Sequence, residues 1–326
     1  MGASPLGEDV VASLRCPACG GRLAAAAGGF RCAAPECARE YPVVSGVPIL
    51  VDESRSLLRI SDYRDRERVL VADGDGRRSG LRALAARLYD LIPDVVDNPV
   101  AAANYGRFAS SLLARGGRPR VLVVGGREVG HGMQSLLETQ GIELVETDID
   151  FGPRTRLVCD AHQLPFAGAS YDGLVIQAVL EHVLDPWACV EEIHRVLRPD
   201  GLVYAETPFL YRRHGGPFDF TRFTFLGHRR LFRRFREEAA GAAVGPGVAL
   251  ALGYTGFLLA LSRRRAIRAF LRVFGRLTSF WLKYVDRALL RNDACLDAAA
   301  GFYFLGRRSE DTLPDRELIR QFRGMR

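Results

Sequence analysis

The stretch VLVVGGREVGHGM (Val121–Met133) places an apolar run directly before a glycine-rich segment. Four consecutive apolar residues followed by a glycine pair are typical of a buried strand that ends in a tight turn. A turn that binds a dinucleotide pyrophosphate reads G-x-G-x-x-G, and here Arg127 occupies the position of the second glycine. The glycine spacing therefore disfavours a dinucleotide and favours a cofactor that carries no phosphate.

Downstream of this turn, short apolar runs alternate with helix-like stretches. A helix is expected from the turn through Gln140, and another over PWACVEEIHRVL (Pro186–Leu197), whose apolar residues recur at helical intervals. The other expected strands are Glu143–Thr147, Arg156–Cys159, Asp172–Gln177, Gly201–Thr207, a segment near Ala242–Leu252, and Gly301–Arg308. This alternation predicts an α/β fold with a doubly wound, mostly parallel, seven-stranded sheet.

Ligands on open parallel sheets bind at the carboxyl ends of the strands. In this chain, polar or small residues stand at four such ends: Gly125 with Gly126, Asp148, Asp160 with Ala161, and Gln177. Asp148 follows Gly125 by 23 residues, about the offset at which an acidic residue reaches ribose hydroxyls. We therefore expect these strand ends to form one binding site.

The stretch from Val121 to Pro208 resembles the class I S-adenosylmethionine-dependent methyltransferases, in the group that includes ubiquinone-biosynthesis methyltransferases. The motifs that carry the resemblance are VVGG, TDID, CDAHQLPF, YDGLVIQAVLEHV and RVLRPDGLVYAETP. The resemblance implies a Rossmann-like fold and S-adenosyl-L-methionine as cofactor. It also assigns roles along the cofactor: the methionine part near Gly125 and Gly126, the ribose at Asp148, the adenine beside Asp160 and Ala161, and the sulfonium near Gln177.

Methyl transfer from a sulfonium is an in-line displacement in which the cofactor supplies the reactive group and the protein positions the nucleophile. His182, just beyond the fourth strand, is a candidate catalytic residue near the methyl group or, equally, a loop anchor. The segment Thr207–Thr224 adds His214 and Asp219, which either take part in catalysis or stabilise a turn. This segment is a candidate lid over the substrate.

Four cysteines near the N-terminus form two close pairs, Cys16 with Cys19 and Cys32 with Cys37, in the spacings C-x2-C and C-x4-C. Such pairs predict a structural, all-thiolate Zn²⁺ site, with disulfides or idle thiols as the alternative. The segment Leu14–Val51 resembles the small zinc-ribbon proteins that activate methyltransferases acting on tRNA and translation factors. The N-terminus lacks the pattern of a signal peptide, so a reducing cytoplasm is expected.

The same patterns suggest a division of the chain. We expect a zinc ribbon over 1–52, a linker and helical region over 53–97, a methyltransferase domain over 98–310 and a tail over 311–326. The linker contains ADGDGRRSG (Ala72–Gly80) and helical spacing over Leu81–Leu91. Within the methyltransferase domain, a helix is expected over Pro99–Arg115 and a basic helical insertion over about 253–297.

The positive charge is concentrated in that insertion. Arg263–Arg291 holds nine cations and one anion, a net +8, so the rest of the +7 chain carries −1. Its apolar residues fall on one helical face, which is expected to pack on the protein's own core, with an anionic membrane surface as the alternative partner. The preceding uncharged run, Ala239–Leu261, is long enough to span a bilayer, but five glycines and Pro246 interrupt it, so no membrane span is expected.

Three hypotheses for function follow. The leading one is methylation of a small-molecule or a lipid- or glycan-linked acceptor by a cytoplasmic enzyme that is peripheral at the inner face of the membrane. The second is methylation of ribosomal or transfer RNA, because a four-cysteine ribbon ahead of this fold also resembles the ribosomal-RNA guanine methyltransferases. The third is a non-catalytic binding scaffold, motivated by Val123, where the family usually has an acidic residue, and by Arg127. The sequence leaves the acceptor and the oligomeric state open.

Overall fold

The computed structural model describes residues 6–64, 80, 89 and 91–324. The predicted loop Ala72–Gly80 and the predicted helix Leu81–Leu91 lie outside the described residues, apart from Gly80, Tyr89 and Leu91.

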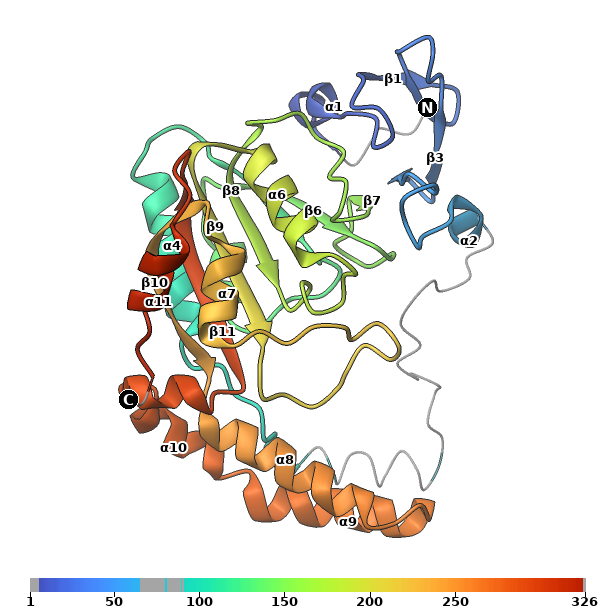
Figure 1. Cartoon of the computed structure of the whole chain (residues 1–326). Coiled ribbons are helices and arrows are strands. Elements are labelled where there is room, and N and C mark those ends of the chain that lie inside the picture. The colour runs from blue at the N-terminus through green and yellow to red at the C-terminus, as the bar shows by residue number, and fades with distance from the viewer. Residues whose placement is uncertain (1–5, 65–79, 81–88, 90, 325–326) are drawn as a thin grey trace.

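One mixed sheet runs through the described part of the chain, with eleven strands in the order β1-β2-β3-β4-β7-β6-β5-β8-β9-β11-β10 (Figure 1). The strands are β1 Leu23–Ala26, β2 Gly29–Cys32, β3 Glu40–Val44, β4 Val47–Leu50, β5 Arg120–Val124, β6 Glu143–Asp148, β7 Leu157–Cys159, β8 Tyr171–Gln177, β9 Leu197–Pro208, β10 Phe235–Val244 and β11 Gly301–Arg308. The predicted seven-stranded sheet corresponds to β5 to β11, so the prediction missed four strands.

The four additional strands come from the N-terminal cysteine unit, residues 6–52. Its last strand, β4, pairs in parallel with β7, with Ile49 opposite Val158 and Leu50 opposite Cys159. All four side chains are buried, so pairing removes an apolar edge of the central sheet from water. The N-terminal unit is therefore continuous with the sheet, whereas the sequence suggested a separate ribbon followed by a linker.

Helices cover both faces of the central strands. The described helices are α1 Glu8–Ser13, α2 Ile60–Arg64, α4 Ala101–Leu113, α5 Gln134–Leu137, α6 Pro186–Val196, α7 Phe225–Leu231, α8 Pro246–Ala260, α9 Arg265–Ser279, α10 Leu282–Leu289, the 3-10 helix η1 Asp293–Asp297, and α11 Asp315–Arg320. Alternate side chains of β5 point to opposite faces of the sheet. Leu122 and Val124 pack in the core that includes α6, whereas Val121 and Val123 pack in the core that includes α4.

The predicted helix from the glycine turn through Gln140 is mostly absent, and only the four residues of α5 are α-helical. Two glycines explain this result. Gly132 has φ of +72°, outside the helical region, and a Cβ atom on Gly130 would lie 1.8 Å from Oε1 of Gln177. The segment before α5 therefore packs closely against the sheet as an irregular loop.

The insertion begins earlier than predicted. The strand expected near Ala242–Leu252 is β10, which ends at Val244, because Gly245 and Pro246 start α8 at that point. The uncharged run Ala239–Leu261 is thus divided between a strand and a helix. Within the described residues, we find no helix with the length and apolar character needed to cross a membrane.

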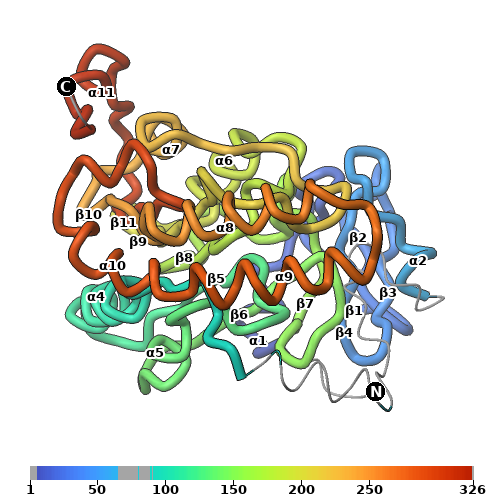
Figure 2. Tube along the Cα trace, turned by 90° about the horizontal axis from the view of Figure 1, so that it is seen from below, coloured from blue at the N-terminus to red at the C-terminus, as the bar shows by residue number. Residues whose placement is uncertain are grey.

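The expectation that the apolar face of the insertion packs on the core is also wrong. α8 and α9 lie side by side (Figure 2), and α9 buries only Gly275 and Ser279 while most of its large apolar side chains remain exposed. Small residues allow the two helices to approach closely, so the contact does not need the large ones.

Candidate active site

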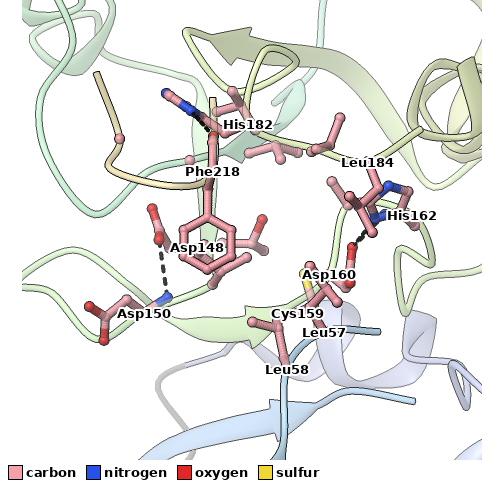
Figure 3. A pocket seen from close by; sticks show the side chains of 18 of the residues that line it. Leu57, Leu58, Asp148, Asp150, Cys159, Asp160, His162, His182, Leu184 and Phe218 are labelled. Carbon is pink, nitrogen blue, oxygen red and sulfur yellow. Dashed lines mark hydrogen bonds and ion pairs between the residues drawn. The ribbon is translucent and has the colours of Figure 1, made fainter. Parts of the chain in front are cut away.

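A cavity of about 680 Å³ lies at the carboxyl ends of β5, β6, β7 and β8 (Figure 3). Five of the six residues that the resemblance assigns to the cofactor line it: Gly125, Asp148, Asp160, Ala161 and Gln177. The sixth, Gly126, is not among the lining residues. His182, His214 and Phe218 line the same cavity, whereas Asp219 does not.

The glycine turn after β5 is shaped by contacts within the protein. Gly125 has φ of +81°, and a Cβ atom there would lie 2.4 Å from Cγ2 of Val179. The N–H groups of Gly125 and Gly126 both donate to the carbonyl oxygen of Thr147 at 2.9 Å. These amides therefore already have an acceptor within the protein. Gly126 serves packing instead, since a Cβ there would lie 2.8 Å from Cβ of Glu146.

Asp148, at the end of β6, is held by two backbone donors. The N–H of Arg127 donates to Oδ2 at 3.0 Å and that of Asp150 to Oδ1 at 3.1 Å. The Arg127 guanidinium in turn lies 3.1 Å from Asp150 Oδ2. Burial raises the pKa of Asp148 above its ordinary value. Arg127, which departs from the family's glycine pattern, thus fixes the acidic corner of the cavity.

Asp160, at the end of β7, is tied to two partners that the sequence did not single out. Its Oδ1 lies 2.5 Å from Nδ1 of His162, and its Oδ2 accepts a hydrogen bond from the hydroxyl of Ser56. Although burial opposes ionisation, these hydrogen bonds hold the pKa of Asp160 below its usual value. Leu57 and Leu58, the two residues after Ser56, line the cavity. All three residues follow β4 of the N-terminal unit. No local sequence signal marks these three residues, because only the β4–β7 pairing brings them here.

The side-chain amide of Gln177 forms hydrogen bonds with other residues of the protein. Its Oε1 accepts from the Tyr105 hydroxyl at 3.1 Å, and its Nε2 donates to Oε2 of Glu206 at 2.8 Å and to the carbonyl oxygen of His131 at 3.0 Å. The next residue, Ala178, also lines the cavity and has φ of +54°, a conformation that non-glycine residues rarely adopt. Gln177 therefore shapes the wall of the cavity with its amide already satisfied.

Glu181, His182 and His214 gather at the other end of the cavity. Nδ1 of His182 donates to the carbonyl oxygen of Phe218 at 2.5 Å, and Nδ1 of His214 lies 3.3 Å from the carbonyl oxygen of Arg212. The Nε2 atoms of His182 and His214 lie 3.7 Å and 3.3 Å from Oε1 of Glu181. The Glu181 side chain is fully buried, and neither of its oxygens accepts a hydrogen bond within the described residues.

This arrangement requires a positive charge. An imidazole that donates through Nδ1 presents a lone pair at Nε2 when it is neutral, and here both lone pairs would face a buried carboxylate. A proton on Nε2 of His214 resolves the conflict, because it would be donated to Glu181, and this interaction raises the pKa of His214 above its ordinary value. A cation is the other solution, because one atom from each of the three side chains lies within 4.8 Å of the others.

The loop after β9 is fitted onto this cluster. Gly215 has φ of +69°, and a Cβ atom there would lie 2.5 Å from Cε1 of His182, so only glycine allows this approach. Asp219 Oδ2 accepts from the backbone N–H of His214 at 2.8 Å and from Arg222 at 2.6 Å. These contacts give Asp219 the geometry of a loop anchor, which was the alternative to catalysis that the sequence left open.

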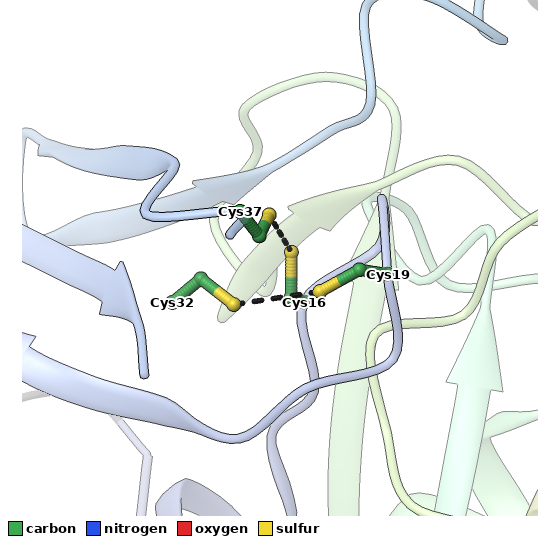
Figure 4. Close-up of side chains that lie close together, drawn as sticks. All are labelled: Cys16, Cys19, Cys32 and Cys37. Carbon is green, nitrogen blue, oxygen red and sulfur yellow. Dashed lines mark hydrogen bonds between the residues drawn. The ribbon is translucent and has the colours of Figure 1, made fainter. Parts of the chain in front are cut away.

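The four N-terminal thiols converge on one point (Figure 4). Sγ of Cys16 lies 3.8 Å from that of Cys37, Sγ of Cys19 lies 3.5 Å from that of Cys32, and all four lie within 4.8 Å of one another. Four thiolates around a tetrahedral zinc ion with bonds of about 2.3 Å stand roughly 3.8 Å apart. A Cβ atom on Gly21 would lie 3.1 Å from Sγ of Cys32, so a side chain at this position would crowd the cluster. The residues present fit a zinc ion.

Comparisons with known proteins agree with this architecture in part. Residues 106–205 match the family model described as a methyltransferase domain. No curated protein matches the chain. The chain is also similar to a putative sarcosine dimethylglycine methyltransferase from Galdieria sulphuraria, at 14% identity over 70% of this chain and 97% of that one, with a TM-score of 0.41. A geranyl diphosphate methyltransferase in complex with SAM gives 16% identity over 72% and 93% and a TM-score of 0.40. Both TM-scores indicate only weak structural similarity.

The family match runs from within α4 to within β9 and so contains all the strand ends that form the cavity. This part of the chain is a methyltransferase domain.

Proposed function

We propose that this enzyme binds S-adenosylmethionine along the strand ends and transfers its methyl group to a small-molecule or lipid-linked acceptor. The Asp148 carboxylate would accept hydrogen bonds from the ribose hydroxyls, and Asp160 and Ala161 would border the adenine. Gln177 and Ala178, at the end of β8, would border the sulfonium. The bound cofactor supplies the methyl group, and the protein orients the two reactants and excludes water.

The acceptor occupies the end of the cavity lined by His182 and His214, with the Glu181 carboxylate buried behind them. His214 keeps its proton against Glu181, and Nε2 of neutral His182, 3.7 Å from that carboxylate, accepts the proton that a hydroxyl or amine nucleophile releases as it attacks the methyl group. The single observation that carries this proposal is that two imidazoles line the same cavity as Asp148 and converge on the buried carboxylate of Glu181.

The wall between the two ends favours an apolar acceptor. Val179, Val183, Leu184 and Phe218 line it, and the neighbouring Leu57 and Leu58 add to the apolar surface. A nucleic acid would instead require cations beside the cavity to neutralise its phosphates. Arg127 is half-buried in pairs with Asp150 and Glu128, and Arg55 pairs with Asp52.

The proposal is tested by incubating the protein with S-adenosylmethionine labelled in the methyl group and an extract of its source cells. The extract is then separated into small-molecule, lipid, RNA and protein fractions. We expect label in the small-molecule or lipid fraction. Label confined to RNA or protein would contradict the proposal, and heat-inactivated enzyme provides the blank.

Substitution of Glu181 by glutamine is expected to lower kcat about 100-fold, because the proton acceptor loses the charge that supports it. Binding of S-adenosylmethionine should stay nearly unchanged, since Glu181 lies at the acceptor end. Initial rates with the acceptor found above, together with calorimetric titration of the cofactor, measure the two effects. Equal rates for the two proteins would exclude a role for Glu181. A parallel assay with a chelator asks whether a cation replaces the proton, in which case the wild-type rate falls as well.

Cofactor affinity is expected to depend on pH through Asp148. Its pKa is raised by burial, and ribose hydroxyls donate to its ionised form, so protonation opposes binding. Affinity should be constant above this raised pKa and should fall as the pH drops through it. Calorimetry over a series of mildly acidic buffers measures the effect, and Asp148→Asn should show weak binding without that dependence. A wild-type affinity that does not change over the series would contradict the assignment.

We also propose that Cys16, Cys19, Cys32 and Cys37 bind one structural Zn²⁺. Four thiolates leave no open coordination position, so the ion holds the N-terminal unit in shape and takes no part in methyl transfer.

A further inference from the structure

The helical insertion presents an unusually large amount of apolar side chain to solvent. Among the described residues, more than half of the large hydrophobic side chains that are exposed belong to α8, α9, α10 and the residues joining them. They are Leu250, Phe257, Leu261, Ile267, Phe270, Phe274, Leu277, Trp281, Tyr284, Val285 and Leu289. Exposed apolar patches of this kind on soluble proteins mark sites of interaction.

The helices hold this surface outward because of how they pack. A Cβ atom on Gly275 of α9 would lie 3.1 Å from Thr255 and 3.3 Å from Leu258 of α8, so the two helices are already in close contact. α10 is joined to α8 by Asp286, whose carboxylate accepts from the backbone N–H groups of Gly247 at 2.6 Å and Val248 at 3.0 Å. These contacts stabilise the insertion and leave the apolar side chains named above exposed.

The surface charge of the segment Arg263–Arg291 is entirely positive. Asp286, the one acid among the nine cations of Arg263–Arg291, is buried in its contact with α8. Within the part of the chain that the structure describes, none of the nine cations forms an ion pair. Apolar side chains lie on one face of α9, and Arg265, Arg268, Arg272 and Arg276 lie on another. This is the pattern of a helix that lies in the interface of an anionic bilayer.

The insertion is connected to the acceptor end of the cavity. Val244, where β10 ends, lies opposite Gly301, and Gly301 lies opposite Pro208, where β9 ends. The insertion and the active-site loop therefore leave the sheet at the same edge. Tyr211 of that loop packs in the cluster that contains Val248 and Leu252 of α8, and its ring contacts that of His214 at 5.4 Å between centroids.

We propose that α8, α9 and α10 dock the enzyme on an anionic lipid bilayer. The apolar residues enter the headgroup region, and the arginines and Lys283 bind lipid phosphates. A second copy of this chain is the wrong partner for a symmetric contact, because it would bring two segments of net charge +8 together. If the proposed function holds, the docked enzyme takes a lipid-linked acceptor directly from the membrane, but the docking itself depends on neither cofactor nor acceptor.

The experiment uses the full-length protein and vesicles of phosphatidylcholine with or without phosphatidylglycerol. We expect sedimentation with the anionic vesicles, weaker at high salt, and little with phosphatidylcholine alone. In the variant Trp187→Phe, Trp281 is the only tryptophan, and its fluorescence should shift to the blue on binding. Absence of binding to anionic vesicles would overturn the proposal. So would equal binding to both kinds of vesicle, or a protein dimer or RNA complex that buries Trp281 without vesicle binding.

Two sets of variants locate the contact. Phe270→Ser with Leu277→Ser should weaken partitioning by about tenfold for each side chain. Arg265→Gln with Arg272→Gln should weaken it by about fivefold for each cation. The control is Ile319→Ser on α11, since Ile319 and Phe270 have the same exposure of 67%. A control that loses as much binding as the α9 variants would overturn the assignment to this surface. Failure of vesicle binding leaves methyl transfer to a soluble acceptor intact, so the two proposals fail separately.

Discussion

Replacement of Asp148 by alanine is expected to lower the affinity for S-adenosylmethionine by at least about 100-fold. Hydrogen bonds to a charged group contribute about 1.5–3 kcal/mol each, and the two ribose hydroxyls would lose theirs together. The fold should persist, because Asp148 stands at the end of β6 and the neighbouring strands do not depend on its side chain. Calorimetric titration measures the affinity, and thermal unfolding verifies the fold.

A second substitution separates charge from packing. Alanine leaves the N–H groups of Arg127 and Asp150 without their acceptor, whereas asparagine keeps an oxygen near one of them. Asp148→Asn should therefore unfold close to the wild-type temperature and still bind the cofactor weakly. If either variant binds S-adenosylmethionine as tightly as the wild type, the proposed placement of the cofactor is wrong.

Loss of one thiol from the N-terminal cluster is the other change with a large expected effect. Cys19→Ser should remove the zinc ion and unfold the N-terminal unit, because binding of structural zinc contributes about 10–16 kcal/mol in small metal-dependent domains. The Cys19 side chain is exposed, so its replacement costs little packing, and a large effect must come from the metal. Metal analysis of the purified protein and thermal unfolding report the two consequences.

Loss of the zinc ion should also change the shape of the cavity. Ser56, Leu57 and Leu58 follow β4, and they reach the cavity only while β4 is paired with β7. Cys19→Ser is therefore expected to weaken S-adenosylmethionine binding although no cysteine of the cluster lines the cavity. Cys295→Ser, a cysteine far along the chain, should retain one zinc ion per chain. Wild-type protein without zinc, or Cys19→Ser with a full complement of it, would refute the site.

Several features of this protein could be predicted from sequence because they depend on local pattern. The apolar runs of β5, β6, β8 and β9 and the helical period of α6 reflect burial of one face or one stripe, which is periodic along the chain. Strand-end placement of Asp148 and Asp160 follows from the parallel order of those strands. Glu181 was not predicted, although it stands next to His182, because its burial depends on the loop after β9 folding over it.

The sequence by itself determined the central α/β sheet, the positions of the polar residues at its carboxyl edge and the spacing of four thiols, since each is encoded in neighbouring residues. Only the tertiary structure decided that β4 extends the sheet and carries Leu57 and Leu58 to the cavity. It also decided that the apolar face of α9 points to solvent. Both outcomes depend on which surfaces meet between segments distant in the chain, and the periodicity of a segment shows that a face is apolar without showing what covers it.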